Sequence, residues 1–239
     1  MKEESLELMD DDKEYEVSID KKLRKGFITK VYGIIFFQLL ITSSAVYISL
    51  VNEAIMKFMM QNNYIIYITS ISAFLVLLIL VCGKLTNVVP INYILLLIFT
   101  LFESISIAFI TVYYDPISVL SCAGLSMLVV FGLTMYACFT KKDFTVMGGF
   151  LFTCSIILIF LGFIGFFFRS YFYQMFLNSI GVLLMSVYLI FDTQLVIGKN
   201  SQLIKLDDYI LGALNIYLDI INIFLKILRL FGKKNKDIY

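Results

Sequence analysis

Seven uninterrupted apolar segments constrain this chain more than any other feature of its sequence. Each holds 18 to 26 residues, and a helix of about 20 residues crosses the hydrocarbon core of a bilayer. The segments lie at residues 31–51, 64–81, 91–112, 117–139, 146–168, 172–197 and 209–231. Only 15% of the 239 residues are charged, against about 25% in a soluble domain. None of the segments alternates like a barrel strand, so we predict an all-α polytopic membrane protein with six or seven transmembrane helices.

The charges outside these segments divide the chain into three parts. Residues 1–25 form an acidic and then basic tail, residues 26–232 a membrane-embedded helical domain, and residues 233–239 a basic C-terminal tail. If the segments alternate across the membrane, ten Lys and Arg residues of the connectors lie on the amino-terminal side and two on the other. Because basic connectors stay on the cytosolic side of a membrane, we expect a cytosolic N-terminus.

The seventh segment has two possible courses. If it crosses the membrane, Lys233, Lys234 and Lys236 face away from the cytosol, against the preference of basic residues. It can instead be re-entrant and return to the cytosolic side, buried by the other helices. Counting charges leaves both courses open.

Several classes of function are excluded by what the sequence lacks. There is no histidine, which excludes Ser-His-Asp and Cys-His catalysis and histidine metal sites. Neither a Walker A nor a Gly-x-Gly-x-x-Gly loop occurs, and the four cysteines match neither a zinc pattern nor a disulfide framework. We therefore expect no enzymatic activity, no cofactor and no nucleic-acid partner.

Three acids lie well inside the apolar segments: Glu103, Asp192 and Asp219. Each costs several kcal/mol in hydrocarbon unless it is paired, protonated or hydrated, so a functional role is the first hypothesis. The alternative is a protonated acid that forms an interhelical hydrogen bond.

Asp192 and Asp219 flank the connector between the sixth and seventh segments. Counted from its midpoint, Asp192 is 11 residues back and Asp219 is 16 residues forward, a difference of about 8 Å of helical rise. Because adjacent antiparallel helices bring such positions to similar depth, and an asymmetric turn or local unwinding can close this gap, we expect the two carboxylates to meet.

A polar stripe surrounds Asp219 on the seventh segment. Its members recur every three or four residues and so share one helical face; they are Gly212, Asn215, Asp219, Asn222 and Lys226. This stripe predicts a central seventh helix, with Glu103, Asn215 and Asn222 supporting the carboxylate pair. A second stripe, at residues 38, 42, 45 and 49, indicates a helix-packing surface.

Two carboxylates in a low dielectric cannot easily both ionise, so the pair is expected to share a proton and to titrate as a unit. Their oxygens are also hard ligands that suit Ca²⁺, which makes Asp192 and Asp219 a candidate transient metal site. The hypothesis is that the protonated, bridged pair closes a pore and that deprotonation opens a path for cations.

The sequence around these acids resembles the transmembrane Bax inhibitor motif family, in its Lifeguard branch. The most specific segments are YLIFDTQL at 188–195 and ALNIYLDIINIFL at 213–225. Supporting segments are VYG at 31–33, PIN at 90–92, FTLFES at 99–104 and KDFT at 142–145. The resemblance covers residues 26–234, and the short amino terminus is similar to that of the Golgi anti-apoptotic members.

This resemblance implies a seventh segment surrounded by six helices, a Ca²⁺ leak from internal stores sensed by Asp192 and Asp219, and an anti-apoptotic role. Its implied setting is the bilayer of the Golgi or endoplasmic reticulum, with apoptosis regulators or calcium-release channels as partners. Ca²⁺ is then the permeant ion rather than a cofactor. The family often carries an arginine latch at the end of the second helix, where this chain has only Lys84.

A second departure lies before the seventh segment, where the family's Pro-Glu-Glu-Tyr is replaced by Leu-Asp-Asp-Tyr at 206–209. Asp207 and Asp208 keep the charge and are predicted to form a cytosolic vestibule for cations, or else a solvated helix start that favours acids.

Two other functions compete with the leak channel. A non-conducting membrane adaptor could regulate death or calcium channels through helix contacts, and nothing in the sequence excludes it. An intramembrane aspartyl protease also places aspartates on its sixth and seventh helices, but it needs a Gly-x-Gly-Asp loop where this chain has Asn-Ile-Tyr-Leu-Asp at 215–219.

Overall fold

The computed structural model describes residues 2–167, 170–198 and 208–235, with the side chains of residues 2–21 and Phe166 left out. The elements, in chain order, are α1 (Lys2–Val51), α2 (Glu53–Gln61), α3 (Ile65–Cys82), the 3₁₀ turn η1 (Leu85–Asn87), α4 (Ile91–Thr111), α5 (Pro116–Phe139), η2 (Thr145–Met147), α6 (Gly148–Phe167), α7 (Tyr171–Ile197) and α8 (Tyr209–Phe231). In these residues the only strand-like pairing is one isolated bridge, between Tyr114 and Lys234.

Seven of these helices are long and apolar enough to cross a membrane, which confirms the predicted all-α polytopic fold. The first span begins at Lys22, nine residues before the predicted apolar segment. It belongs to a helix that is continuous from Lys2, so the tail predicted at residues 1–25 and the first span share α1. Hydrocarbon contains no water to satisfy backbone groups, so each apolar segment folds as a helix that pairs its own amides and carbonyls.

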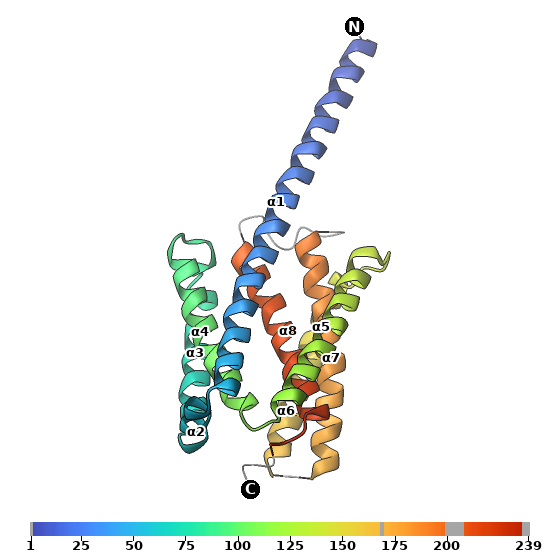
Figure 1. Cartoon of the computed structure of the whole chain (residues 1–239). Coiled ribbons are helices and arrows are strands. Elements are labelled where there is room, and N and C mark those ends of the chain that lie inside the picture. The colour runs from blue at the N-terminus through green and yellow to red at the C-terminus, as the bar shows by residue number, and fades with distance from the viewer. Residues whose placement is uncertain (1, 168–169, 199–207, 236–239) are drawn as a thin grey trace.

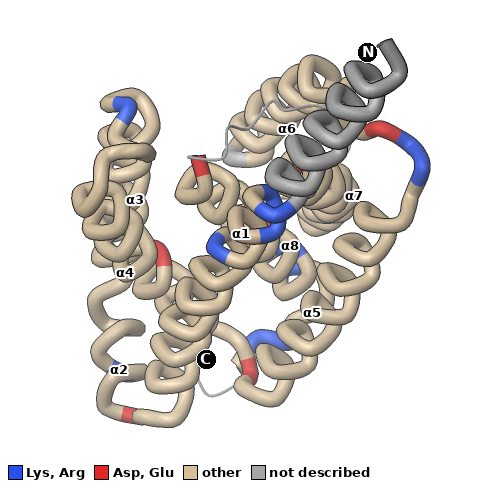
Figure 2. The backbone as a smooth tube through the Cα atoms, turned by 90° about the horizontal axis from the view of Figure 1, so that it is seen from above, with Lys and Arg blue, Asp and Glu red and all other residues tan. Residues whose placement is uncertain are grey.

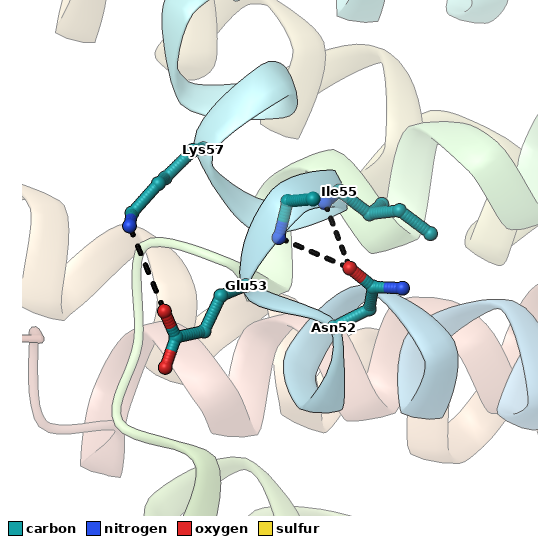
Figure 3. Close-up of polar contacts among 5 residues, drawn as sticks. Asn52, Glu53, Ile55 and Lys57 are labelled. Atoms are coloured by element: carbon teal, nitrogen blue, oxygen red, sulfur yellow. Dashed lines mark hydrogen bonds and ion pairs between the residues drawn. The ribbon is translucent and has the colours of Figure 1, made fainter.

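Local signals set where several helices begin and end. Asn52 begins α2, because its Oδ1 accepts hydrogen bonds from the amides of Ala54 and Ile55 at 3.0 and 3.2 Å (Figure 3). One turn along, Glu53 and Lys57 form an exposed ion pair at 3.6 Å, also drawn in Figure 3. Such caps satisfy amides that have no partner within the helix, which makes the first turn stable.

Two more helix ends are set by local signals of this kind. Asp115 begins α5 by accepting a hydrogen bond from the amide of Ser118 at 3.0 Å, with Pro116 in the first turn, where its missing amide hydrogen costs nothing. Gly198 ends α7 in the left-handed region, at a φ of +69°, which glycine adopts without strain.

Helix α8 lies at the centre of the bundle. It packs against α1, α4, α5 and α7, whereas α3 packs mainly on α4 and α6 mainly on α7. Viewed along the bundle, α8 is surrounded by the other helices (Figure 2). This is the central position that its polar stripe predicts.

The core of the bundle consists of two apolar clusters, and α8 contributes to both. The first joins α1, α5 and α7 to Ala213, Ile216 and Ile223 of α8. The second joins α3 and α4 to other residues of α8, among them Leu214 and Tyr217. The central helix therefore has an apolar face for each half of the bundle, and eleven of its 23 residues are buried.

The seventh segment forms one helix that is long enough for a full crossing. Helix α8 is unbroken over 23 residues, about 35 Å of rise. Beyond its end, Lys233 accepts a hydrogen bond from the amide of Asp115 at 2.9 Å, and the amide of Asn235 donates to the carbonyl of Tyr113 at 3.0 Å. The chain after α8 is thus tied to the α4–α5 connector, at the end of the bundle away from the start of α8 (Figure 1). The structure therefore favours crossing over re-entry.

This course leads to a test of membrane topology. With seven crossings, the two ends of the chain lie on opposite sides of the membrane. We expect a glycosylation acceptor tag to be modified when it is appended after Tyr239 and to stay unmodified when it is placed before Met1. A gel-shift assay with and without glycosidase measures the glycosylation of each tag. If both tags are modified, or if neither is, the full crossing by α8 is contradicted.

Candidate functional site

The two buried aspartates meet across the α7–α8 contact. Asp192 lies on α7 with 5% of its surface exposed, and Asp219 lies on α8 with 6% exposed. Their carboxyl groups face each other at hydrogen-bonding range, and Asn215 offers its side chain to Asp192. The structure thus brings together the pair that was predicted from its position around the connector, together with one of the three residues predicted to support it.

This contact has a direct chemical consequence. An ionised carboxylate is only an acceptor of hydrogen bonds, so two carboxyl groups can bridge each other only when they hold at least one proton. The Oδ2 atom of Asp219 is buried and has no hydrogen-bond partner among the described residues. The pair therefore keeps a free oxygen for a proton or a cation.

The pair occupies the middle of a seam between α7 and α8. A methyl group built on Gly212 would lie 3.1 Å from Cγ2 of Val196 on α7. A methyl group on Gly181 of α7 would lie 2.8 Å from Cε of Lys226 on α8. Going down α8, the seam is therefore apolar at Gly212, acidic at Asp219 and basic at Lys226.

Apolar side chains of three helices meet at Gly212, on the side of the pair where α8 begins. The methyl group built there would also meet Val31 Cγ2 at 3.6 Å and Phe27 Cζ at 3.9 Å. Helices α1, α7 and α8 thus pack closely through apolar side chains at Gly212, about two turns from Asp219 toward the start of α8.

Glu103 lies elsewhere, near Tyr217 on the other side of α8. It is half-buried on α4 and forms no hydrogen bond with the aspartate pair in the described part of the chain. Close by, Thr42 of α1 is hydrogen-bonded to Ser104 of α4 at 2.9 Å and to Tyr217 of α8 at 2.8 Å. Gln38 adds a hydrogen bond from its Nε2 to Thr100 at 3.0 Å. The stripe predicted as a packing surface on the first segment therefore joins α1 to both α4 and α8.

The remaining predicted residues are separate from the pair. Asn222 is half-buried and donates from Nδ2 to the carbonyl of Leu218 in its own helix at 2.9 Å. Asp208, predicted as part of a vestibule, accepts a hydrogen bond from Asn87 at 2.7 Å, which ties the start of α8 to η1. Asp207 lies outside the described residues.

Gln194 is an organising residue that the sequence analysis missed. It is 1% exposed, on α7 two residues beyond Asp192. Its Nε2 donates to the carbonyl of Lys142 at 2.9 Å, and its Oε1 accepts from the amide of Phe144 at 2.8 Å. It thereby fixes the α5–η2 connector to the helix that carries Asp192. The two segments were recognised separately, at 142–145 and at 188–195, and no pattern in either indicates that they touch.

Arg24 is a second residue that was missed. From α1 it donates to two carbonyls at the end of α7, from Nη2 to Leu195 at 2.7 Å and from Nε to Ile197 at 3.2 Å. Its guanidinium lies 5.2 Å from the ring centre of Phe27, and a side chain on Gly198 would overlap it. Since terminal carbonyls carry partial negative charge, a cation is favourable there. The arginine that contacts α7 thus comes from the N-terminal helix, while Lys84 is exposed at the end of α3.

The acidic groups do not form a resident metal site. Within the residues described, no group of three or more His, Cys, Asp or Glu side chains gathers in one place. The pair offers two carboxyl groups, fewer ligands than the six to eight oxygens that bound Ca²⁺ takes. A cation bound there would need water to complete its coordination.

The geometry defines a class of protein: a seven-helix membrane protein whose central helix carries a bridged, buried carboxylate pair. The family described as "Inhibitor of apoptosis-promoting Bax1" matches residues 24–236. The chain is 32% identical over 214 residues to Protein lifeguard 4 of Mus musculus, covering 90% of this chain and 87% of that protein. It is 34% identical over 222 residues to Protein lifeguard 3 of Homo sapiens, covering 90% and 71%. The chain belongs to the Bax inhibitor motif family.

The position of Gln194 leads to a stability prediction. Replacing Gln194 by Leu leaves the Phe144 amide and the Lys142 carbonyl without their partner. We expect the free energy of unfolding to fall by about 1–2 kcal/mol, because a stranded buried group costs about 1–3 kcal/mol and these two backbone groups are only partly buried. Equilibrium unfolding in mixed detergent micelles measures the change.

The matched control is Ser121→Ala. Ser121 is exposed on α5 and donates only to the carbonyl of Ile117 in its own helix, so its loss is expected to change stability by less than about 0.5 kcal/mol. Equal effects of the two substitutions would contradict the role assigned to Gln194.

Proposed function

We propose that this protein is a pH-sensitive Ca²⁺ leak channel of intracellular membranes, closed by the bridge between Asp192 and Asp219. The observation that carries the proposal is the contact of these two buried carboxyl groups on the two helices that form the central seam. The protein is further proposed to have a cytosolic N-terminus, to reside in the Golgi or endoplasmic reticulum, and to restrain apoptosis by regulating stored calcium.

Protonation accounts for gating in this proposal. With a shared proton, the pair bridges α7 and α8. When the proton leaves, two negative charges about 4 Å apart repel each other by about 4 kcal/mol at an effective dielectric constant of about 20. This repulsion is released when the helices separate, or when water or a cation enters between the carboxylates. Rising pH therefore favours the open state.

The same groups account for selectivity among ions. Carboxylate oxygens, among them the free Oδ2 of Asp219, are hard ligands that attract Ca²⁺ strongly, and the side-chain carbonyl of Asn215 provides a further oxygen beside them. A site with so few protein ligands binds weakly, and weak binding lets an ion leave as well as enter.

The apolar cover around Gly212 accounts for closure toward the proposed cytosolic side. Phe27, Val31 and Val196 surround Gly212 with apolar groups, and an apolar constriction stops ions by excluding water. Arg24 ties α1 to the end of α7 and so holds this cover in place. Separation of α7 from α8 would loosen both the bridge and the cover.

The decisive test is Ca²⁺ flux through purified protein in liposomes, from about pH 5 to about pH 8. We expect wild-type flux to rise more than about tenfold with pH as the pair loses its proton. In Asp192→Asn and in Asp219→Asn the amide donates to the remaining carboxylate at every pH. Both variants are therefore expected to keep the low flux that the wild type shows at low pH. The ratio of their flux at about pH 8 to that at about pH 5 is expected to be about one.

The control is Glu53→Gln, the same chemical change at an exposed residue of α2, which is expected to keep the wild-type pH response. An unaltered pH response in the Asp192 variant would refute gating by the pair. No flux above that of empty liposomes at any pH would instead support the non-conducting adaptor, with the aspartates serving to hold the helices together.

A further inference from the structure

Lys226 is a cation inside the bundle on the same seam as the aspartate pair. It follows Asp219 by seven residues on α8, two turns and about 10 Å further along the helix. It is half-buried. A charged side chain at such a position is costly, so it calls for an explanation beyond packing.

The groove that holds Lys226 is shaped by Gly181 of α7. A methyl group on Gly181 would lie 2.8, 2.9 and 3.1 Å from Cε, Cδ and Nζ of the lysine. The stem and the ammonium group therefore lie directly on the α7 backbone, in space that exists only because residue 181 has no side chain. Glycine at this position keeps the charge between the two helices.

Among the described residues, nothing compensates the charge of Lys226. No hydrogen bond or ion pair joins it to any of them, and the charged group that acts on it is Arg229, of the same sign. Arg229 is exposed one turn further along and lies close to Tyr114 of the α4–α5 connector. Burial raises the pKa of the Tyr114 hydroxyl, and Arg229 partly offsets this effect.

The geometry points to Lys226 as the residue that limits cation entry from the C-terminal end of α8 and discriminates against divalent ions. This inference rests on the proposed function, because it needs ions to move along the α7–α8 seam. A cation that reaches Asp219 from this end passes the ammonium group. The repulsion is proportional to the charge of the ion, so the barrier for Ca²⁺ is twice that for K⁺.

This proportionality yields a quantitative test in the liposome assay. Because rates depend exponentially on barriers, removing the charge multiplies Ca²⁺ flux by the square of the factor for K⁺. We expect Lys226→Gln to raise K⁺ flux about threefold and Ca²⁺ flux about tenfold. Lys226→Arg keeps the charge and is expected to keep the wild-type ratio of the two fluxes. The matched control is Lys57→Gln, which neutralises an exposed lysine on α2, a helix that lies at the same end of the bundle as the end of α8 (Figure 1).

Gly181→Ala provides an independent variant that keeps the lysine. Its methyl group displaces only the flexible end of Lys226. We expect it to raise the ratio of Ca²⁺ to K⁺ flux in the wild-type background and to have no effect on that ratio in the Lys226→Gln background. Such a double-mutant cycle assigns the effect of Gly181 to the lysine.

The outcomes separate this inference from the proposed function. If wild type conducts and the aspartate variants lose their pH response, but Lys226→Gln leaves the flux ratio unchanged, only the role of Lys226 is overturned. Equal increases for K⁺ and Ca²⁺ also overturn it, since they indicate a loosened seam without electrostatic selection. Absence of wild-type flux at every pH overturns both.

Discussion

Hydrocarbon cannot hydrate a carboxyl, amide or ammonium group, and the arrangement of this bundle follows from that constraint. Helix α8 carries the polar stripe, and it is the helix that the others surround. Its acid meets another acid on α7, and its lysine lies over Gly181. The outer helices α3 and α6 contain no acidic or basic residue and present apolar side chains outward.

The contact between α7 and α8 carries three environments in order along one seam. Around Gly212 the packing is apolar and tight, at Asp219 two acids bridge, and at Lys226 a positive charge lies without a counter-charge from the part of the chain that the structure describes. Hydrogen bonds at the edges of the seam tie it to the rest of the molecule. Arg24 joins α1 to the end of α7, and Gln194 joins the α5–η2 connector to the same helix. A change in the protonation of the pair would therefore be felt by α1 and α5 as well as by the two helices that form it.

The fold and the centre of the site were predictable because both depend on local patterns. Apolar length identifies membrane helices, and the spacing of Asp219 from its polar neighbours identifies the buried face of α8. The residues that were missed, Gln194 and Arg24, bind backbone carbonyls or amides 50 to 173 positions away. A backbone partner has no residue type, so such contacts leave no trace in the sequence. Glu103 shows a related limit. Helix α8 has polar residues on two sides, and the sequence pattern of α4 does not indicate which of these sides Glu103 faces.

The sequence by itself determined the number of apolar helices, their approximate ends and the placing of Asp192 and Asp219 on either side of one connector, within about 8 Å of helical rise of each other. These properties follow from hydropathy, caps and helical rise, which act over a few residues. Only the tertiary structure decided that α8 runs unbroken at the centre of the bundle, that Lys226 lies over Gly181, and that Phe27 and Val31 of α1 meet α8 at Gly212. These three features depend on which helix surfaces face each other. Packing between segments that are distant in the sequence decides this, because the surfaces must fit in shape and buried polar groups must find partners.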